Sequence, residues 1–195
     1  MKKARIFFIL FAMAFPAILF AEGLQDKQTK MQMELKRICS EILCRPSLDI
    51  RLRKEDGSIF ESNTGVSLPI VQGGMVTIYP GEIIYLEADA GTEGLQNIRA
   101  VEKMSDPTRT MVLKFEQKSG QKFSERFMML NFSNPFSRPL KYHASMMLLD
   151  GKVHKTSSCP VPAGLSAYED WAQPIFQLIL TDFRFVSDKD TKCEY

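Results

Sequence analysis

The side chain best suited to acid-base chemistry in this sequence is His143, one of only two histidines. Imidazole titrates near neutral pH and Ser145 follows two positions later, so a hydrolytic pair is the first chemistry to consider. Both lie between Leu140 and Leu149, an alternating segment that predicts a strand with His143 on the polar face. Positions two apart on a strand are roughly 6 to 7 Å apart at Cα, and the sequence has no Gly-x-Ser-x-Gly segment. We predict a solvent-facing histidine without a catalytic role.

A second candidate is the pair of adjacent carboxylates Glu169 and Asp170, which stand between Tyr168 and Trp171. Two carboxylates on a loop, beside an aromatic ring that could stack on a sugar, would suit glycoside hydrolysis. The same composition is typical of an ordinary surface loop. A secreted hydrolase that uses these loop carboxylates is therefore the alternative function, and no catalytic residue is assigned.

The segment from Thr156 to Trp171 also suits recognition, because it contains two prolines, a cysteine and the only tryptophan. A long loop tied by a disulfide is ordered before it binds, which lowers the entropic cost of binding. We predict a binding role for Tyr168, Glu169, Asp170 and Trp171. The other interpretation is that the loop closes one end of the domain and Trp171 fills the core.

Eleven methionines raise the question of a copper site, since thioether and imidazole ligands suit Cu(I). Three of them, Met111, Met128 and Met146, fall on apolar faces of predicted strands, where methionine is an ordinary core residue, and Met13 leaves with the leader. Only His143, Met147 and Met129 could gather outside the core. We predict no metal and no cofactor, keep His143 and Met147 as candidate binding residues, and retain a small-ligand or metal carrier as a further alternative.

The four cysteines are Cys39, Cys44, Cys159 and Cys193. An even count without a Cys-x-x-Cys pair favours two disulfides over a zinc or redox site. Three connectivities are possible. Pro46 disfavours helix at the preceding residue, so a helix should end near Leu43 and let Cys44 turn back to Cys39. We favour that pairing, which leaves Cys159 to join Cys193 and pin the C-terminal tail.

Two disulfides fit an exported protein, and the first 21 residues have the features of a Sec-type signal peptide. Lys2, Lys3 and Arg5 precede an apolar run from Ile6 to Phe20, with a small residue at the expected cut after Ala21. The apolar run is too short to span a bilayer stably, so we expect no transmembrane segment in the mature chain. Such a leader is typical of a Gram-negative bacterium and predicts a periplasmic or secreted protein.

Removal of this leader also changes the charge of the chain. Three basic residues and no acids leave with it, so Lys+Arg falls from 25 to 22 against 23 Asp+Glu, and the net charge becomes about −1. A nearly neutral chain without a basic stripe does not favour nucleic-acid binding.

The elements that would position these residues change in type at Pro46. From Gln25 to Leu43 the chain lacks Gly and Pro and places Met31, Leu35, Ile38 and Ile42 at helical spacing. This pattern predicts one amphipathic helix. The apolar stripe of this helix should pack on the domain. The helix could cover the outward face of a sheet, on which we expect five side chains: Phe127, Met129, His143, Met147 and Ile179.

After Pro46, short alternating segments separated by Gly and Pro turns predict about eight strands. Asp56-Gly57 marks a hairpin. In the last strand, Phe176, Leu178 and Leu180 share one parity whereas Phe183 and Phe185 have the other. A one-residue change of parity predicts a β-bulge near Thr181 or Asp182.

We therefore expect an all-β protein, mainly an antiparallel β-sandwich of immunoglobulin-like architecture, with one N-terminal α-helix. Residues 1–21 would be the signal peptide, 22–45 the amphipathic helix and 46–195 a single sandwich domain. The expected function is that of a non-enzymatic binding or interaction module of the cell envelope. Its partner would be another envelope protein or a cell-wall component.

Overall fold

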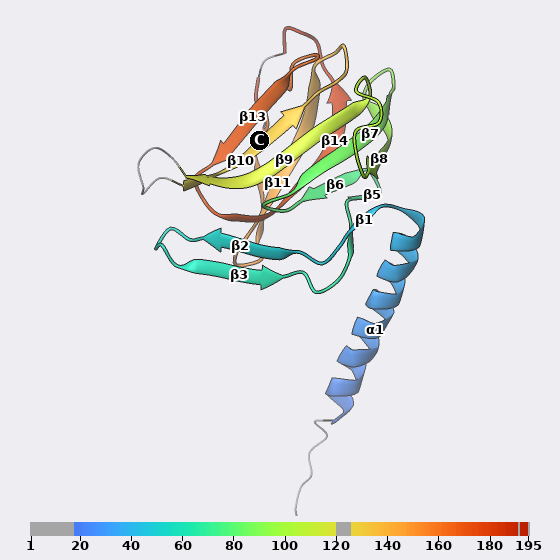
Figure 1. Cartoon of the computed structure of the whole chain (residues 1–195), viewed down its shortest axis with the longest axis vertical. Helices are drawn as coiled ribbons and strands as arrows, with labels where there is room; N and C mark the ends of the chain where they lie inside the picture. Colours follow the sequence, from blue (N-terminus) through green and yellow to red (C-terminus); the bar gives the residue numbers. More distant parts are fainter. Residues whose placement is uncertain (1–17, 120–125, 191, 195) are drawn as a thin grey trace, which may run out of the picture. The chain divides into compact units, whose positions relative to one another are not determined.

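The structure is a computed structural model that describes residues 18–119, 126–190 and 192–194 (Figure 1). Apart from its last four residues, the signal peptide predicted over residues 1–21 lies outside the described residues. The chain divides into two compact units, Met1–Glu34 and Leu35–Tyr195, and each is described by itself. The domain boundaries proposed at residues 21 and 45 stay predictions.

Helix α1 spans Ile18–Glu41 and is the one helix among the described residues. The predicted N-terminal helix is confirmed, with bounds shifted from the expected Gln25 to Leu43. Residues of high helix propensity fill it, and exposed ion pairs one turn apart, such as Lys30–Asp26 at 2.9 Å, support it. No helix within the described residues is long and apolar enough to cross a membrane.

The chain turns sharply after this helix. The amide of Ile42 donates the last helical hydrogen bond to the carbonyl of Ile38 at 3.1 Å. A disulfide then joins Cys39 to Cys44, whose Cα atoms are 5.4 Å apart. The predicted pairing is confirmed, and the second bond joins Cys159 to Cys193.

Two small sheets of two strands each follow. Strand β1 (Cys44–Arg45) pairs with β4 (Leu68–Pro69), and β2 (Asp49–Arg53) pairs with β3 (Ile59–Asn63). The predicted hairpin between β2 and β3 is confirmed. Gly57 adopts a φ of 84°, the left-handed region that favours glycine in such a turn.

Two five-stranded antiparallel sheets form the body of the second unit (Figure 1). The first has the order β13-β10-β9-β7-β8, and its strands are β7 (Ile83–Ala90), β8 (Leu95–Val101), β9 (Thr110–Ser119), β10 (Arg126–Ser133) and β13 (Ser166–Trp171). The second has the order β12-β11-β14-β6-β5, and its strands are β5 (Val71–Gln72), β6 (Met75–Ile78), β11 (Leu140–Leu148), β12 (Val153–Thr156) and β14 (Ile175–Phe185).

The hydrophobic core draws on both sheets, as alternation of apolar and polar positions predicts. The first sheet contributes Leu113, Phe115 and Leu130, and the second contributes Ile78, Tyr142 and Leu178, all completely or almost completely buried. The all-β sandwich with one helix is therefore confirmed. Strands β8 and β12 were not predicted, because their residues are largely polar or exposed.

The predicted bulge in the last strand is also confirmed. Between Lys141↔Arg184 and His143↔Thr181 the pairing of β11 with β14 shifts register, and Asp182 adopts a φ of 54°. The extra residue reverses the parity of β14. As a result, Leu178 and Leu180 before the bulge are buried, and so are Phe183 and Phe185 after it.

Candidate functional site

The segment predicted as an aromatic recognition loop is in part an edge strand, so the prediction of a loop was wrong at β13. Trp171 is 8 % exposed, and its indole N–H donates to the hydroxyl of Thr156 at 2.7 Å. Its ring also packs edge-to-face on Phe115. The other interpretation, in which Trp171 fills the core, is what the structure has, and this ring offers no surface on which a sugar could stack.

Glu169 and Asp170 do not converge, because adjacent residues of a strand point to opposite faces of the sheet. Glu169 is half-buried on the core side and accepts a hydrogen bond from the amide of Cys159 at 2.5 Å. Burial raises its pKa, and the neighbouring charge of Asp170 adds to this effect. Asp170 is exposed on the outer face. The pair therefore lacks the facing geometry of a two-carboxylate site.

Tyr168 is the exposed aromatic of this strand, with 65 % of its surface accessible. The amide of Asn134 donates to the carbonyl of Leu165 at 2.9 Å, which marks a directly hydrogen-bonded pair of β10 and β13. Such pairs alternate along an antiparallel ladder. Because β13 has no register shift, the backbone groups of Ser166, Tyr168 and Asp170 must point away from β10, toward the free edge.

The four edges of the two large sheets differ in how they are protected. Strand β5 has only two residues, and β12 has four with His154 and Lys155 among them. The pairing of β8 is interrupted by a register shift, and Asn97 in β8 has a φ of 52°. Short length, charges and irregularities are the usual protections of an edge. Strand β13 also carries the charged residues Glu169 and Asp170, but it is the longest of the four edges that pairs without a register shift, over six residues.

His143 lies on the outer face of β11, as predicted, and 54 % of its side chain is exposed. It lines a small cavity of about 140 Å³ together with Ser145, Thr181 and other polar groups. Its Nδ1 is 3.5 Å from the carboxylate of Asp182. Met147 is half-buried on the same side of β11. A binding role for His143 and Met147 stays a prediction.

The outward apolar face predicted from five side chains is not one surface. Phe127 and Met129 belong to β10 in the first sheet, whereas His143, Met147 and Ile179 belong to β11 and β14 in the second. The sequence pattern gave the correct parity within each strand, but it contained no information on which strands share a sheet.

Lys141 lies on the face of β11 that was predicted to be exposed to solvent, yet only 1 % of its surface is accessible. The C-terminal tail covers it. Its Nζ donates to Glu194 at 2.8 Å and to Asp190 at 3.2 Å. Burial alone would lower the pKa of Lys141, but these hydrogen bonds outweigh it and the pKa is raised. The alternation of the strand could not predict this burial, because Asp190 and Glu194 are about 50 positions away in the sequence. Only the predicted Cys159–Cys193 disulfide indicated that the tail lies near this strand.

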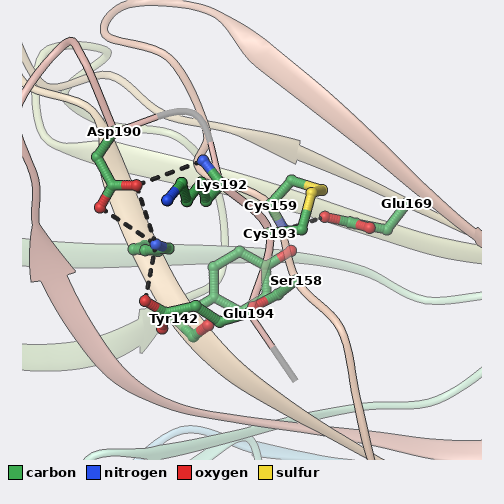
Figure 2. The surroundings of a disulfide bond; sticks show 9 residues. Tyr142, Ser158, Cys159, Glu169, Asp190, Lys192, Cys193 and Glu194 are labelled. Carbon is green, nitrogen blue, oxygen red and sulfur yellow. Dashed lines mark hydrogen bonds and ion pairs between the residues drawn. A yellow bond between two sulfur atoms is a disulfide. The ribbon is translucent and has the colours of Figure 1, made fainter.

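Glu194 is also bound from its other side. Its second carboxylate oxygen contacts the guanidinium of Arg184 and lies 3.8 Å from Nε2 of His143. Its backbone forms two hydrogen bonds with Ser158, of 2.8 and 2.9 Å. Figure 2 shows Glu194 and Asp190 near the Cys159–Cys193 bond that holds the tail.

A buried ion pair at the first β-strand is a further polar cluster that the sequence did not indicate. Arg45 and Glu82 lie 2.9 Å apart with side chains 2 % and 10 % exposed. The guanidinium donates to the hydroxyl of Thr77 at 3.0 Å and stacks 4.8 Å above the ring centre of Tyr79. Burial lowers the pKa of Arg45 and raises that of Glu82, although the opposite charges partly compensate.

Within the described part of the chain, no group of three His, Cys, Asp or Glu side chains is placed to hold a metal ion. Comparison of the chain with protein-family models, with curated proteins and with solved structures found no match. The functional argument therefore depends on the chain's own geometry.

Proposed function

We propose that this protein is a binding module of the cell envelope, exported to the periplasm or beyond, which takes up an extended segment of another envelope protein at strand β13. The observation that carries this proposal is the regular, unbulged edge of β13. An edge strand with free N–H and C=O groups is a template for an added strand.

Three features of β13 support this mode of binding. The outward backbone groups belong to Ser166, Tyr168 and Asp170, three residues whose side chains are all exposed. The tyrosine supplies apolar area and a hydroxyl, a combination common in interfaces. On its inner side the strand is anchored by buried Trp171 and by the bond from Cys159 to Glu169. A strand held in this way loses little conformational entropy on binding.

Export is part of the proposal and is supported by two disulfides among the described residues. Disulfides persist in oxidising compartments. The leader of residues 1–21 points to the same compartment. Detection of the mature N-terminus in a periplasmic or secreted fraction would support this step, and a mature chain found in the cytosol with its leader intact would overturn it.

The strand-addition step can be tested by Tyr168→Pro. Proline removes the amide that points to the free edge, and edge strands tolerate proline at such positions. In cross-linking from a native envelope fraction, we expect a partner captured by the unmodified chain to be lost with Tyr168→Pro. Tyr168→Ala should keep part of the binding, because the backbone groups remain.

The matched control is Glu55→Pro, at the second position of the β2–β3 turn, where proline is compatible with the backbone. This control should bind the partner like the unmodified chain. Equal capture by Tyr168→Pro and Glu55→Pro would contradict a binding role for the β13 edge. Both variants should show cooperative unfolding near that of the unmodified chain, which excludes loss of fold as the cause.

A further inference from the structure

The polar cluster on the outer side of β11 and β14 has the form of an occupied binding site. We name Lys141, Arg184 and His143 the clasp site. Lys141 holds one oxygen of the Glu194 carboxylate at 2.8 Å, and Arg184 holds the other. Two cationic groups that engage both oxygens of one carboxylate are the usual means of carboxylate recognition. The bound carboxylate belongs to the chain itself.

The side chains of the clasp site come from two neighbouring strands of the second sheet and not from the tail. Lys141 and His143 come from β11 and Arg184 comes from β14, next to the bulge. Asp182 contacts Arg184 at 2.5 Å and lies 3.5 Å from His143, so it orients both. Without the tail, Lys141 and Arg184 would carry two positive charges against the single negative charge of Asp182. The empty site would therefore attract an anion.

The tail itself is held mainly by its covalent bond. It consists of polar residues, Ser187 to Asp190 and Lys192 to Glu194, and most of them are exposed. Its described contacts with β11 and β14 are ion pairs, and its backbone adds only the two hydrogen bonds with Ser158. Lys141 is buried, but its partners Asp190 and Glu194 are 34 % and 40 % exposed, so water weakens these ion pairs. Ordering a tail, by contrast, has an entropic cost at every residue.

We propose that the clasp site is a carboxylate-binding site that the chain's own Glu194 fills as long as the Cys159–Cys193 disulfide is intact. Reduction of this disulfide releases the tail, and the site then binds the side-chain carboxylates of an acidic peptide segment from a partner. This inference concerns a different surface from β13 and does not depend on strand addition there.

The reductant is a dithiol of the thiol–disulfide exchange class. One of its thiolates attacks Sγ of Cys193, the exposed member of the pair, and the S–S bond breaks as a mixed disulfide forms. The second thiol of the reductant then attacks this mixed disulfide and releases Cys193. The reductant leaves as a disulfide, and Cys159 and Cys193 take up its two electrons and two protons as thiols.

The first test is release of the tail, measured by hydrogen exchange at the amides of Ser158 and Glu194. In the oxidised chain their mutual hydrogen bonds should protect them. In Cys159→Ser/Cys193→Ser we expect their exchange to be faster by about a hundredfold or more, since local opening no longer has a covalent restraint. The control Cys39→Ser/Cys44→Ser opens the other disulfide and should leave both amides protected.

The second test is binding of a fluorescein-labelled hexa-aspartate peptide, measured by anisotropy at low salt. We expect the open double variant to bind the peptide about tenfold or more tighter than the oxidised chain does. Arg184→Gln in the open variant should reverse most of that gain. If the double variant does not fold, both measurements are made on the unmodified chain after mild dithiol treatment, with Trp171 fluorescence as the check of its fold.

Three results would overturn the proposal. Protected amides in the open chain would mean that the tail stays bound without its disulfide. Equal affinity of the peptide for open and oxidised chains, or an affinity of the open chain that Arg184→Gln does not reduce, would mean that the clasp site has no role in binding carboxylates.

Discussion

The ion pair of Arg45 and Glu82 allows the most quantitative prediction, because both side chains are buried and only 2.9 Å apart. Glu82→Gln keeps an oxygen that can accept from the amide of Tyr79, which now donates to Glu82 at 2.7 Å. The guanidinium of Arg45 would remain buried without a counter-ion. Breaking a buried pair in this way costs about 3 to 5 kcal/mol.

That cost is large compared with the total stability of a domain, which is about 5 to 15 kcal/mol. With a urea dependence of about 2 kcal/mol per molar, the unfolding midpoint of Glu82→Gln should fall by roughly 1.5 to 2.5 M. The assay is equilibrium unfolding in urea with the disulfides oxidised, followed through the fluorescence of the single buried Trp171. We expect one cooperative transition for each variant.

Two comparisons show whether the buried charge is the cause. Arg45→Met/Glu82→Gln removes the uncompensated cation, so it should recover most of the stability lost in Glu82→Gln. Glu61→Gln breaks the exposed pair Arg51–Glu61, at 3.3 Å, and should cost no more than about 1 kcal/mol. A double variant as unstable as Glu82→Gln, or a loss in Glu82→Gln no greater than in Glu61→Gln, would refute the reasoning.

Three further predictions concern the core, the tail and a close backbone contact. Trp171→Phe should lower the free energy of unfolding by about 1 to 3 kcal/mol in urea, because the buried hydroxyl of Thr156 loses its partner. Hydrogen bonds from the buried lysine hold the pKa of Asp190 and that of Glu194 below their ordinary values of 3.8 and 4.5. Their stabilisation is complete above those values and is lost as the pH falls through the lower folded-state values, so tail amides should exchange faster, relative to intrinsic rates, at pH 3 than at pH 6. Gly94→Ala should lower the thermal midpoint, because its Cβ would lie 2.4 Å from a backbone oxygen of β14; an unchanged midpoint would mean that the strands separate there without cost.

Alternation made much of the fold predictable, since an apolar residue at every second position requires a buried face. The change of parity between Leu180 and Phe183 was enough to place a bulge, because no other arrangement buries both. Pro46 likewise indicated where the helix must end, and with it the pairing of Cys39 with Cys44. These inferences succeeded because each depends on residues close in sequence.

The candidate site was less predictable because its determinants are far apart in the chain. Strand β13 resembles a loop in composition, since an edge strand can expose polar residues such as Ser166 and Asp170. Lys141 has the parity of an exposed residue and is buried only because a tail about 50 positions away covers it. The partner of Arg45 is likewise remote, with no local pattern that connects it to Glu82.

The single inserted residue in β14 has an effect beyond the packing of aromatic rings. A strand in strict alternation presents one outward side chain in every two, whereas here Thr181 and Asp182 come outward in succession, beside His143. The insertion thus concentrates polar groups at one point of an otherwise ordinary surface. If the same residues ran without a bulge, strict alternation would turn Asp182 toward the core and Phe183 and Phe185 toward water. The charge outside and the rings inside therefore depend on the same local distortion of the strand.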